Sequence, residues 1–255
     1  MWDRPDFLDL PARSSKPRVQ GLTHMLDKGV PVAVLDGVLA QAAELIDVLK
    51  IGWGISYVDR TLKQRVALCD AADILVSLGG TLLEVAAIRG RVRELRHWAL
   101  EQGVRAVEVS NGLGMLTVDR KVELIRRLAA DFTVLAETGA KDGRVPVVPA
   151  LWVDEMKRDL DAGARWVIAE GRESGTVGLF QGDSSVREEL VEAIASHLPL
   201  DRVIFEAPLK AQQAWFIRFL GPGVNLGNVP PEETLSLETL RLGLRADTAQ
   251  TRMTR

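Results

Sequence analysis

The sequence predicts a single-domain (β/α)8 TIM barrel, in which eight parallel strands alternate with helices and close into a ring. Three observations predict this fold. The chain has 255 residues, close to the roughly 250 that are common for such barrels. Short apolar runs recur eight times, and a helix-length amphipathic stretch follows each one. No Gly-x-Gly-x-x-Gly turn follows the first run, which disfavours the alternative of an open, doubly wound sheet.

The apolar runs give the expected strands in order. They are residues 21–26 (GLTHML), 47–53 (DVLKIGW), 74–80 (ILVSLGG), 106–112 (AVEVSNG), 133–139 (TVLAETG), 166–171 (WVIAEG), 203–208 (VIFEAP) and 224–228 (VNLGN). Among the helices between them, Asp119 is the expected N-cap of residues 119–131, and Gly163 is the expected stop of residues 152–164. We expect residues 1–20 to form an N-terminal extension, 21–245 the barrel, and 246–255 a flexible C-terminal tail.

The composition disfavours several classes of function. The net charge is -3, and no stripe of Lys and Arg is interleaved with aromatic residues, so we expect no binding to nucleic acid. The only cysteine, Cys69, lies in a helical apolar pattern and is expected to be a packed thiol. The N-terminus lacks the apolar core of a signal peptide, and no apolar run reaches the roughly 18 residues of a membrane span. We therefore expect a cytoplasmic protein that does not bind membranes.

Charged residues end several of the expected strands. Because the carboxyl ends of barrel strands face one shared mouth, residues at these ends are candidates for a functional site. The carboxylates that end four successive runs are Glu108, Glu137, Glu170 and Glu206. The cations that stand within or after the runs are Lys28, Lys50, Lys141 and Arg172.

This mixture of charges predicts a site for an anion and a metal. Carboxylates that face one another in a narrow barrel repel, so they need Lys, Arg or a divalent metal as partners. Mg²⁺ is typically held by one or two protein carboxylates. The pattern thus predicts an anionic substrate held by Lys and Arg, with Mg²⁺ beside it. The alternative is a rim of charges that are only solvated or paired with one another.

Two glycine-rich turns and one histidine add to the candidates. Residues 77–81 (SLGGT) open a helix after the third run, and residues 221–233 (GPGVNLGNVPPEE) surround the eighth. Free N–H groups at such helix starts bind phosphate, although glycine is also the common residue of ordinary turns. Of the three histidines, only His24 lies within an expected strand and could face the barrel interior, and none has metal-ligand spacing.

A set of longer motifs covers nearly the whole chain, from Phe7 to Thr248. In order they are FLDLPARSSKPRVQGLTHMLDKG, LKIGWG, GGTLLEVA, EVSNG, AGARWVIAEGRESG, VIFEAPLKAQQAWFI, VNLGNVPPEE and LETLRLGLRADT. Together they resemble the phosphosulfolactate synthase family. The resemblance implies a (β/α)8 barrel and a lyase that adds sulfite to phosphoenolpyruvate with Mg²⁺, giving (2R)-3-phosphosulfolactate, an early step toward coenzyme M in methanogens. It implies an enolate that the metal stabilises and a lysine protonates.

The same resemblance implies the roles of ten residues. Lys141 is the expected proton donor, and Glu137 and Glu170 are the expected catalytic residues and metal ligands. The expected substrate-binding residues are Lys28, Lys50, Arg172, Glu206, Lys210, Asn225 and Asn228. The substrates would be the small anions phosphoenolpyruvate and sulfite. The resemblance also implies a homo-oligomer, with a trimer as the candidate size.

This chain departs from the family pattern at several positions. Ala140 stands where one of two adjacent lysines is expected, and Asn111 stands where an Asp is expected, which would remove a charge at the mouth. Ser77 and Leu78 replace an aromatic residue and a proline. Two alternatives therefore remain open. One is a barrel enzyme that acts on another phosphorylated three-carbon acid. The other is a non-catalytic stress or interaction protein, since plant heat-stress proteins also belong to the family.

Overall fold

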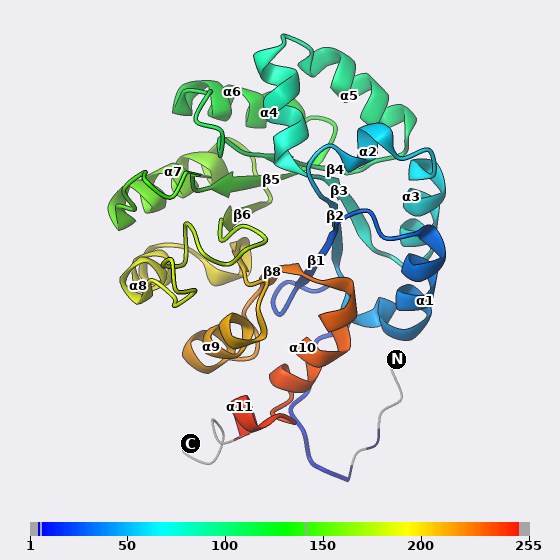
Figure 1. Cartoon of the computed structure of the whole chain (residues 1–255), viewed down its shortest axis with the longest axis vertical. Coiled ribbons are helices and arrows are strands. Elements are labelled where there is room, and N and C mark those ends of the chain that lie inside the picture. Colours follow the sequence, from blue (N-terminus) through cyan, green and yellow to red (C-terminus); the bar gives the residue numbers. More distant parts are fainter. Residues whose placement is uncertain (1–4, 6, 141, 250–255) are drawn as a thin grey trace.

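The computed structural model describes residues 5, 7–140 and 142–249, and these form a closed barrel of eight parallel strands (Figure 1). The strands pair in chain order around the ring, and β1 pairs with β8 to close it. Their bounds are β1 Thr23–Asp27, β2 Val48–Ile51, β3 Leu75–Leu78, β4 Ala106–Val109, β5 Thr133–Thr138, β6 Trp166–Ala169, β7 Val203–Glu206 and β8 Leu226–Val229. Each strand overlaps one of the eight apolar runs, and only β1 and β8 extend one residue past theirs, so the predicted fold is confirmed.

Helices lie outside the ring and connect the strands (Figure 1). The α-helices are α1 Val32–Ala42, α2 Ile55–Val58, α3 Leu62–Ala71, α4 Gly80–Ile88, α5 Val92–Glu101, α6 Val118–Leu128, α7 Pro149–Asp161, α8 Glu188–His197, α9 Lys210–Leu220, α10 Thr234–Arg241 and α11 Ala246–Ala249. Short 3₁₀ turns are η1 Ala43–Leu45, η2 Leu200–Arg202 and η3 Pro231–Glu233. None of the described helices is long and apolar enough to cross a membrane.

Two helix ends test the expected caps. Gly163 follows the last turn of α7 with a φ of 109°, a backbone conformation that favours glycine, so the predicted stop is confirmed. The predicted N-cap of α6 is wrong. Thr117 is the cap, because its hydroxyl accepts the N–H of Arg120 at 3.2 Å. Asp119 lies in the first helical turn, where its negative charge suits the helix N-terminus.

The inside of the barrel consists of an apolar layer and a polar layer. Side chains alternate along a strand, so inward-facing positions recur every second residue. The first inward position of most strands is apolar, and these residues pack together as Leu22, Val48, Ala106, Leu135, Trp166, Ile168 and Ile204. Two residues further along, the inward position carries a charged side chain on β2, β4, β5 and β7. On β6 the corresponding charged residue, Glu170, lies just past the end of the strand. The strands therefore place buried charges on an apolar base, toward their carboxyl ends.

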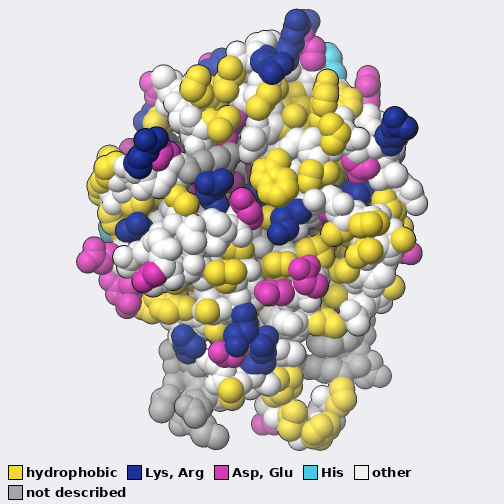
Figure 2. Space-filling view, viewed as in Figure 1, with side chains coloured by type: hydrophobic (Ala, Val, Ile, Leu, Met, Phe, Trp, Pro, Cys, Tyr) yellow, Lys and Arg dark blue, Asp and Glu magenta, His cyan; other side chains and the backbone are white. Residues whose placement is uncertain are grey.

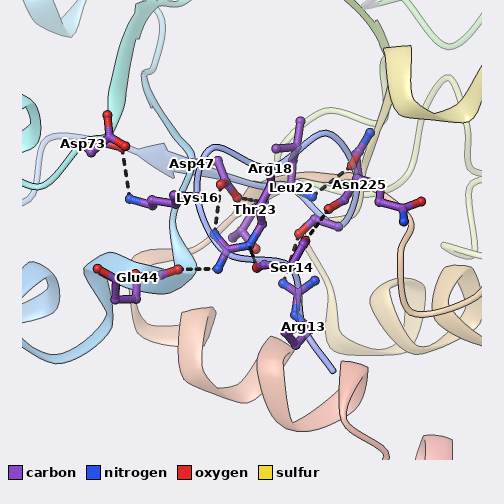
Figure 3. A network of polar contacts seen from close by, with 12 residues as sticks. Arg13, Ser14, Lys16, Arg18, Leu22, Thr23, Glu44, Asp47, Asp73 and Asn225 are labelled. Atoms are coloured by element: carbon purple, nitrogen blue, oxygen red, sulfur yellow. Dashed lines mark hydrogen bonds and ion pairs between the residues drawn. The ribbon is translucent and has the colours of Figure 1, made fainter. Parts of the chain in front are cut away.

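Polar contacts tie the described part of the N-terminal extension to residues at the strand starts (Figure 3). Arg18 donates to the Asp47 carboxylate at 3.0 Å, to the Glu44 carbonyl at 2.6 Å and to the Ser14 carbonyl at 2.8 Å. Asp47 directly precedes β2, so this contact fixes the extension beneath the strand starts.

The expected C-terminal tail is helical where the structure describes it. Residues 246–249 form α11, and the buried Thr248 donates its hydroxyl to the Leu240 carbonyl at 2.8 Å. Residues 250–255 lie outside the described residues. The first residues of the expected tail therefore form a short helix, which a buried hydroxyl ties to α10.

Candidate active site

A cavity of about 230 Å³ opens at the carboxyl ends of the strands. Its charged lining consists of Lys50, Glu137, Glu170, Arg172, Glu173 and Glu206. Backbone from the turns after β2 and β3, around Gly52 and Gly79, forms another part of the wall. On the face turned to the viewer, basic and acidic side chains gather beside a large hydrophobic one near the centre (Figure 2). The cavity thus combines both signs of charge in a small volume.

Lys50 is the centre of the polar layer. Its ammonium Nζ lies 2.9 Å from Glu108, 3.3 Å from Glu137 and 3.2 Å from Glu206, so carboxylates from three other strands surround it. Burial alone would lower the pKa of Lys50, but the three carboxylates outweigh burial and hold that pKa well above its ordinary value. Lys50 is therefore a fixed cation at neutral pH.

Glu108 receives hydrogen bonds on both carboxylate oxygens. Oε2 accepts from the Gly80 N–H at 3.2 Å and contacts Lys50, while Oε1 lies 3.0 Å from Nε2 of His24. Burial would raise the pKa of Glu108, but Lys50 and His24 outweigh it and lower that pKa to about 2. The carboxylate is therefore ionised and fixed, although its side chain is fully buried.

Glu206 connects the end of β7 to the turn after β6. Its Oε2 accepts the backbone N–H groups of Gly171 and Arg172, both at 2.9 Å, while Oε1 contacts Lys50. Burial is the main cause that raises the pKa of Glu206 to about 7; Lys50 opposes this shift and the charge of Glu137 adds to it. Glu206 thus fixes the backbone that carries Arg172 to the cavity wall.

The structure brings six of the ten expected site residues together. They are Lys50, Glu137, Glu170, Arg172, Glu206 and Asn228, and all of them line the cavity. Glu137 lies in β5, and Glu170 directly follows the neighbouring strand β6. In the register of these strands Glu137 pairs with Ile168, so Glu170 lies two residues closer to the mouth. Lys141, the expected proton donor, lies outside the described residues.

Two expected lysines lie away from the described cavity wall. Lys28 is exposed and is not part of the lining. Lys210 is also exposed, and its Nζ donates to the Asp247 carboxylate of α11 at 3.0 Å. As the first residue of α9, Lys210 extends toward the outer helices rather than the barrel axis.

Asn225 lies at the other end of the barrel from the cavity. It precedes β8, and its fully buried amide holds backbone together. Its Oδ1 accepts the N–H of Leu22 at 2.9 Å, and its Nδ2 donates to the carbonyls of Leu200 and Val203. A residue before a strand faces the strand starts, which is why the structure gives Asn225 a position in the barrel base.

Two of the departures from the family pattern, Asn111 and Ala140, occupy different surroundings. Asn111 forms a closed pair with Leu116, donating to its carbonyl at 2.7 Å and accepting its N–H at 2.9 Å. Its amide shapes the loop after β4 and does not line the cavity. Ala140 lines a second, adjacent cavity between the loops after β5 and β6. The Asn111 departure therefore changes a loop contact, whereas Ala140 stands next to the site.

Three contributors to the site are not among the ten residues whose roles the resemblance implied, although the sequence already marked Glu108 and His24 as candidates. Glu108 ends the fourth run like the other carboxylates, and its position was the signal that could have included it. His24 faces the interior, as its place in β1 indicated, and is fully buried there. Trp53 lines the mouth with a φ of 50° and a side chain that is 41% exposed. Only its position directly after β2 could have suggested this.

The cavity contains oxygen atoms of the kind that Mg²⁺ binds. Among the described residues, no group of three or more His, Cys, Asp or Glu could hold a metal. Glu137 and Glu170 line one cavity, and the buried Oδ1 of Asn228 has no hydrogen-bond partner there. Mg²⁺ commonly takes one or two carboxylates and completes its shell with water and substrate oxygens.

Comparisons with known proteins extend over nearly the whole chain. Residues 11–247 match the family model described as (2R)-phospho-3-sulfolactate synthase (ComA). The chain is 38% identical over 247 residues to a phosphosulfolactate synthase of Bacillus subtilis, covering 95% of this chain and 98% of that protein. It is 40% identical over 250 residues to one of Methanothermobacter thermautotrophicus, covering 95% and 96%.

Solved structures agree on the fold. The 3-hexulose-6-phosphate synthase of Salmonella typhimurium superposes with a TM-score of 0.56 at 12% identity, covering 91% of this chain and 98% of that one. At this identity the likeness concerns the barrel alone. The sequence matches are much stronger, and on them the chain is a lyase-type enzyme that belongs to the phosphosulfolactate synthase family.

Proposed function

We propose that this enzyme adds sulfite to phosphoenolpyruvate in a Mg²⁺-dependent reaction that gives (2R)-3-phosphosulfolactate, an early step toward coenzyme M. The family assignment supports the reaction class. The observation that carries the proposal is the cavity itself, which places the cations Lys50 and Arg172 beside carboxylates at the carboxyl ends of the strands. Two small anions that must meet need this kind of mixed-charge site.

The charge of the cavity supports a role for Mg²⁺. Lys50 and Arg172 face the carboxylates of Glu137, Glu170, Glu173 and Glu206 in the described lining. An anionic substrate would be repelled by this excess of negative charge, and a divalent cation offsets the repulsion. Bound Mg²⁺ would act as a Lewis acid toward the substrate carboxylate. Glu137 and Glu170 would hold it, with Asn228 Oδ1 as a further oxygen.

The side chains of the cavity then divide the remaining tasks. Lys50 stays an ammonium and attracts anions, so it cannot serve as a base. Arg172, on backbone fixed by Glu206, would clamp the phosphate or sulfite oxygens. The sulfite sulfur lone pair forms the C–S bond at the methylene carbon, and the C=C electron pair moves toward the carboxylate as an enolate. Protonation of the carbon that bears the phosphate completes the addition, and Lys141 is the proposed donor of this proton.

The test is a direct assay of product formation. Purified protein is mixed with phosphoenolpyruvate, sulfite and Mg²⁺, and phosphorus NMR follows the signals. We expect the phosphoenolpyruvate signal to fall and a new phosphate-ester signal to appear only when sulfite is present. The absence of any sulfonated product with Mg²⁺, Mn²⁺ or Co²⁺ would overturn the proposal.

A second candidate keeps the cavity but changes the substrate. Ala140 replaces an expected lysine beside the site, and this change favours a different phosphorylated three-carbon acid. A ligand that binds only the native state raises Tm. A panel of such acids, tested by thermal shift with Mg²⁺, distinguishes the candidates: phosphoenolpyruvate should give the largest shift if the first proposal is right.

We also propose that the enzyme is a cytoplasmic homo-oligomer, with a trimer as the candidate size. An exposed apolar patch supports self-association: Tyr57 and Val58 are 75% and 77% exposed. Tyr57 and Trp98 line one groove, and their ring centroids are 6.2 Å apart. Light scattering during size-exclusion chromatography would give the mass in solution, and a mass near 28.0 kDa would contradict the oligomer.

A further inference from the structure

We propose that His24 is a positioning residue of this active site, whose imidazole holds Glu108 against Lys50 and ties that carboxylate to the backbone of Asn228. The inference deepens the proposed function, on which its kinetic test rests. Its spectroscopic test depends on the fold alone.

The contacts of His24 determine which ring nitrogen carries the proton. His24 is fully buried in β1. Its Nδ1 faces the backbone N–H of Asn228 at 3.5 Å, and a nitrogen that accepts a hydrogen bond carries no proton. Nε2 therefore carries the hydrogen and donates it to Oε1 of Glu108 at 3.0 Å. The two neighbours fix one tautomer and one ring orientation.

Glu108, which His24 holds in place, in turn fixes the position of the Lys50 ammonium. The Lys50 ammonium lies 2.9 Å from Glu108 but 3.2 Å from Glu206 and 3.3 Å from Glu137. Glu108 is thus its nearest carboxylate, and Oε2 of Glu108 also accepts the Gly80 N–H at the start of α4. A carboxylate held at both oxygens sets the place of the ammonium, and with it the positive charge that faces the cavity.

The other ring nitrogen of His24, Nδ1, contacts the backbone of Asn228 in β8. Asn228 has a φ of 53°, a left-handed backbone conformation that is strained for a residue other than glycine. Its side chain lines the cavity, and its Oδ1 is buried without a hydrogen-bond partner. The bond from its N–H to His24 stabilises this conformation and so keeps the amide turned to the cavity.

The neighbouring residue leaves room for the ring. A Cβ on Gly227 would lie 3.1 Å from Nδ1 of His24 and 3.0 Å from Cγ2 of Ile204. Such contacts force a neighbour to shift, so glycine at 227 lets the imidazole lie between β1, β4 and β8. One side chain thus couples three strands of the polar layer.

Two substitutions of His24 separate positioning from packing. His24→Gln keeps a side-chain N–H donor that can reach Glu108, whereas His24→Leu keeps a similar volume and removes both hydrogen bonds. We expect His24→Leu to lower kcat roughly 10- to 100-fold, the range for partners that orient directly acting ligands, with a smaller change in KM for phosphoenolpyruvate. His24→Gln should recover most of kcat. His197→Leu, on the exposed end of α8, is the control and should keep wild-type kcat.

The result that overturns the proposal is a His24→Leu enzyme with kcat within twofold of wild type, or a His24→Gln enzyme as impaired as His24→Leu. If His24→Leu does not fold, Gly227→Ala takes its place, because it crowds the ring without removing it. Gly37→Ala is its control, since a Cβ at Gly37 meets nothing within 4 Å.

Nitrogen NMR of the imidazoles gives a readout that needs no catalysis. The chain has three histidines, and the His24→Gln variant identifies the His24 signals by their loss. We expect Nε2 to be the protonated nitrogen; an Nδ1–H tautomer would overturn the proposal.

If the wild type forms no sulfonated product, the proposed function fails, and the phosphoenolpyruvate-induced rise in Tm replaces kcat as the measured quantity. His24→Leu must then reduce that rise and His24→Gln retain it, or the inference on His24 fails as well.

Discussion

At the scale of single residues, the charge of the cavity depends on one buried cation. Lys50 is 8% exposed and contacts three carboxylates, whereas Lys28, four residues before α1, is exposed. Removing one partner of a buried charge pair is far more damaging than removing a surface charge, because the remaining charges stay buried without compensation. The two lysines therefore form a matched pair for substitution.

We expect Lys50→Met to lower the free energy of unfolding by about 3–5 kcal/mol and to abolish turnover. Lys28→Met should change stability by less than about 0.5 kcal/mol. Urea unfolding followed by circular dichroism measures both. An equal loss of unfolding free energy in the two variants would show that Lys50 is not needed to compensate the charges of the three carboxylates. A raised KM in Lys28→Met would support the substrate-binding role predicted for Lys28.

A second residue-scale prediction concerns acid. The pKa of Glu108 is lowered from its ordinary value of 4.5 to about 2, since Lys50 and His24 outweigh the effect of burial. A lowered carboxyl pKa contributes stability above the unfolded pKa, and this contribution is lost as pH falls through the folded pKa. The stability advantage of wild type over Glu108→Gln should therefore be full at pH 6 and shrink from pH 4.5 toward pH 2. Thermal unfolding across this range measures it, and a constant difference in Tm would contradict it.

The strand-end rule predicted most of the charged site for a physical reason. Inward positions recur every second residue, so a carboxylate that ends an apolar run, such as Glu137 or Glu206, must face the mouth. The rule failed for Asn225, because a residue before a strand faces the base. It did not predict which groups each charged side chain would contact. Which carboxylate lies nearest to Lys50 depends on distances between strands that are remote in sequence.

At the scale of elements, the turn from β3 into α4 depends on a close approach of backbone to β4. A Cβ on Gly80 would lie 2.3 Å from Oγ and 2.8 Å from Cβ of Ser110. Ser110 in turn donates to the carboxylate of Glu84 on α4. The start of α4, whose first N–H holds Glu108, therefore tolerates no side chain.

Gly80→Ala should lower the free energy of unfolding by about 1–3 kcal/mol, the usual cost of overpacking a buried contact, and should lower activity by moving the Gly80 N–H from Glu108. Gly37→Ala, in the exposed middle of α1, should raise stability by up to about 1 kcal/mol, because alanine favours helix. Denaturant midpoints compare the two variants. A Gly80→Ala protein as stable and active as wild type would mean that α4 shifts without consequence.

The sequence was informative about which elements form and less so about where they end. Eight apolar runs predicted eight strands because a parallel strand that is covered on both faces is mostly apolar. The cap of α6 was misplaced, since Thr117 and Asp119 can both accept the N–H of a first turn, and only the backbone decides between them. Helix α11 was missed because four residues carry too little periodicity to predict a helix.

At the scale of the whole molecule, the ring must be closed between its first and last strands. Arg241 of α10 is almost fully buried and donates to the carbonyls of Pro222, Val224 and Leu22, which precede β8 and β1. Burial lowers the pKa of Arg241 to about 9, and the nearby charge of Arg13 adds to this shift. A costly buried cation thus joins the two strand starts.

Arg241→Met should lower the free energy of unfolding by about 2–4 kcal/mol, since each buried acceptor left unpaired costs roughly 1–3 kcal/mol and the lost cation offsets part of that. Arg91→Met is the control, because Arg91 forms an exposed ion pair with Glu94 and should change stability by less than about 0.5 kcal/mol. The rate of backbone amide hydrogen exchange in β1 and β8 should rise in Arg241→Met and stay unchanged in Arg91→Met. Unchanged exchange there would contradict a role in ring closure.

The apolar layer between the two ends of the barrel makes them energetically independent. Lys50 and its carboxylates lie on one side of Leu135 and Ile168, and the arginines of the base lie on the other. Sites without shared partners have additive effects on stability. Loops at the mouth can therefore be exchanged for new substrates while the base keeps the ring closed, and a scaffold stabilised at the base gains tolerance for change at the mouth.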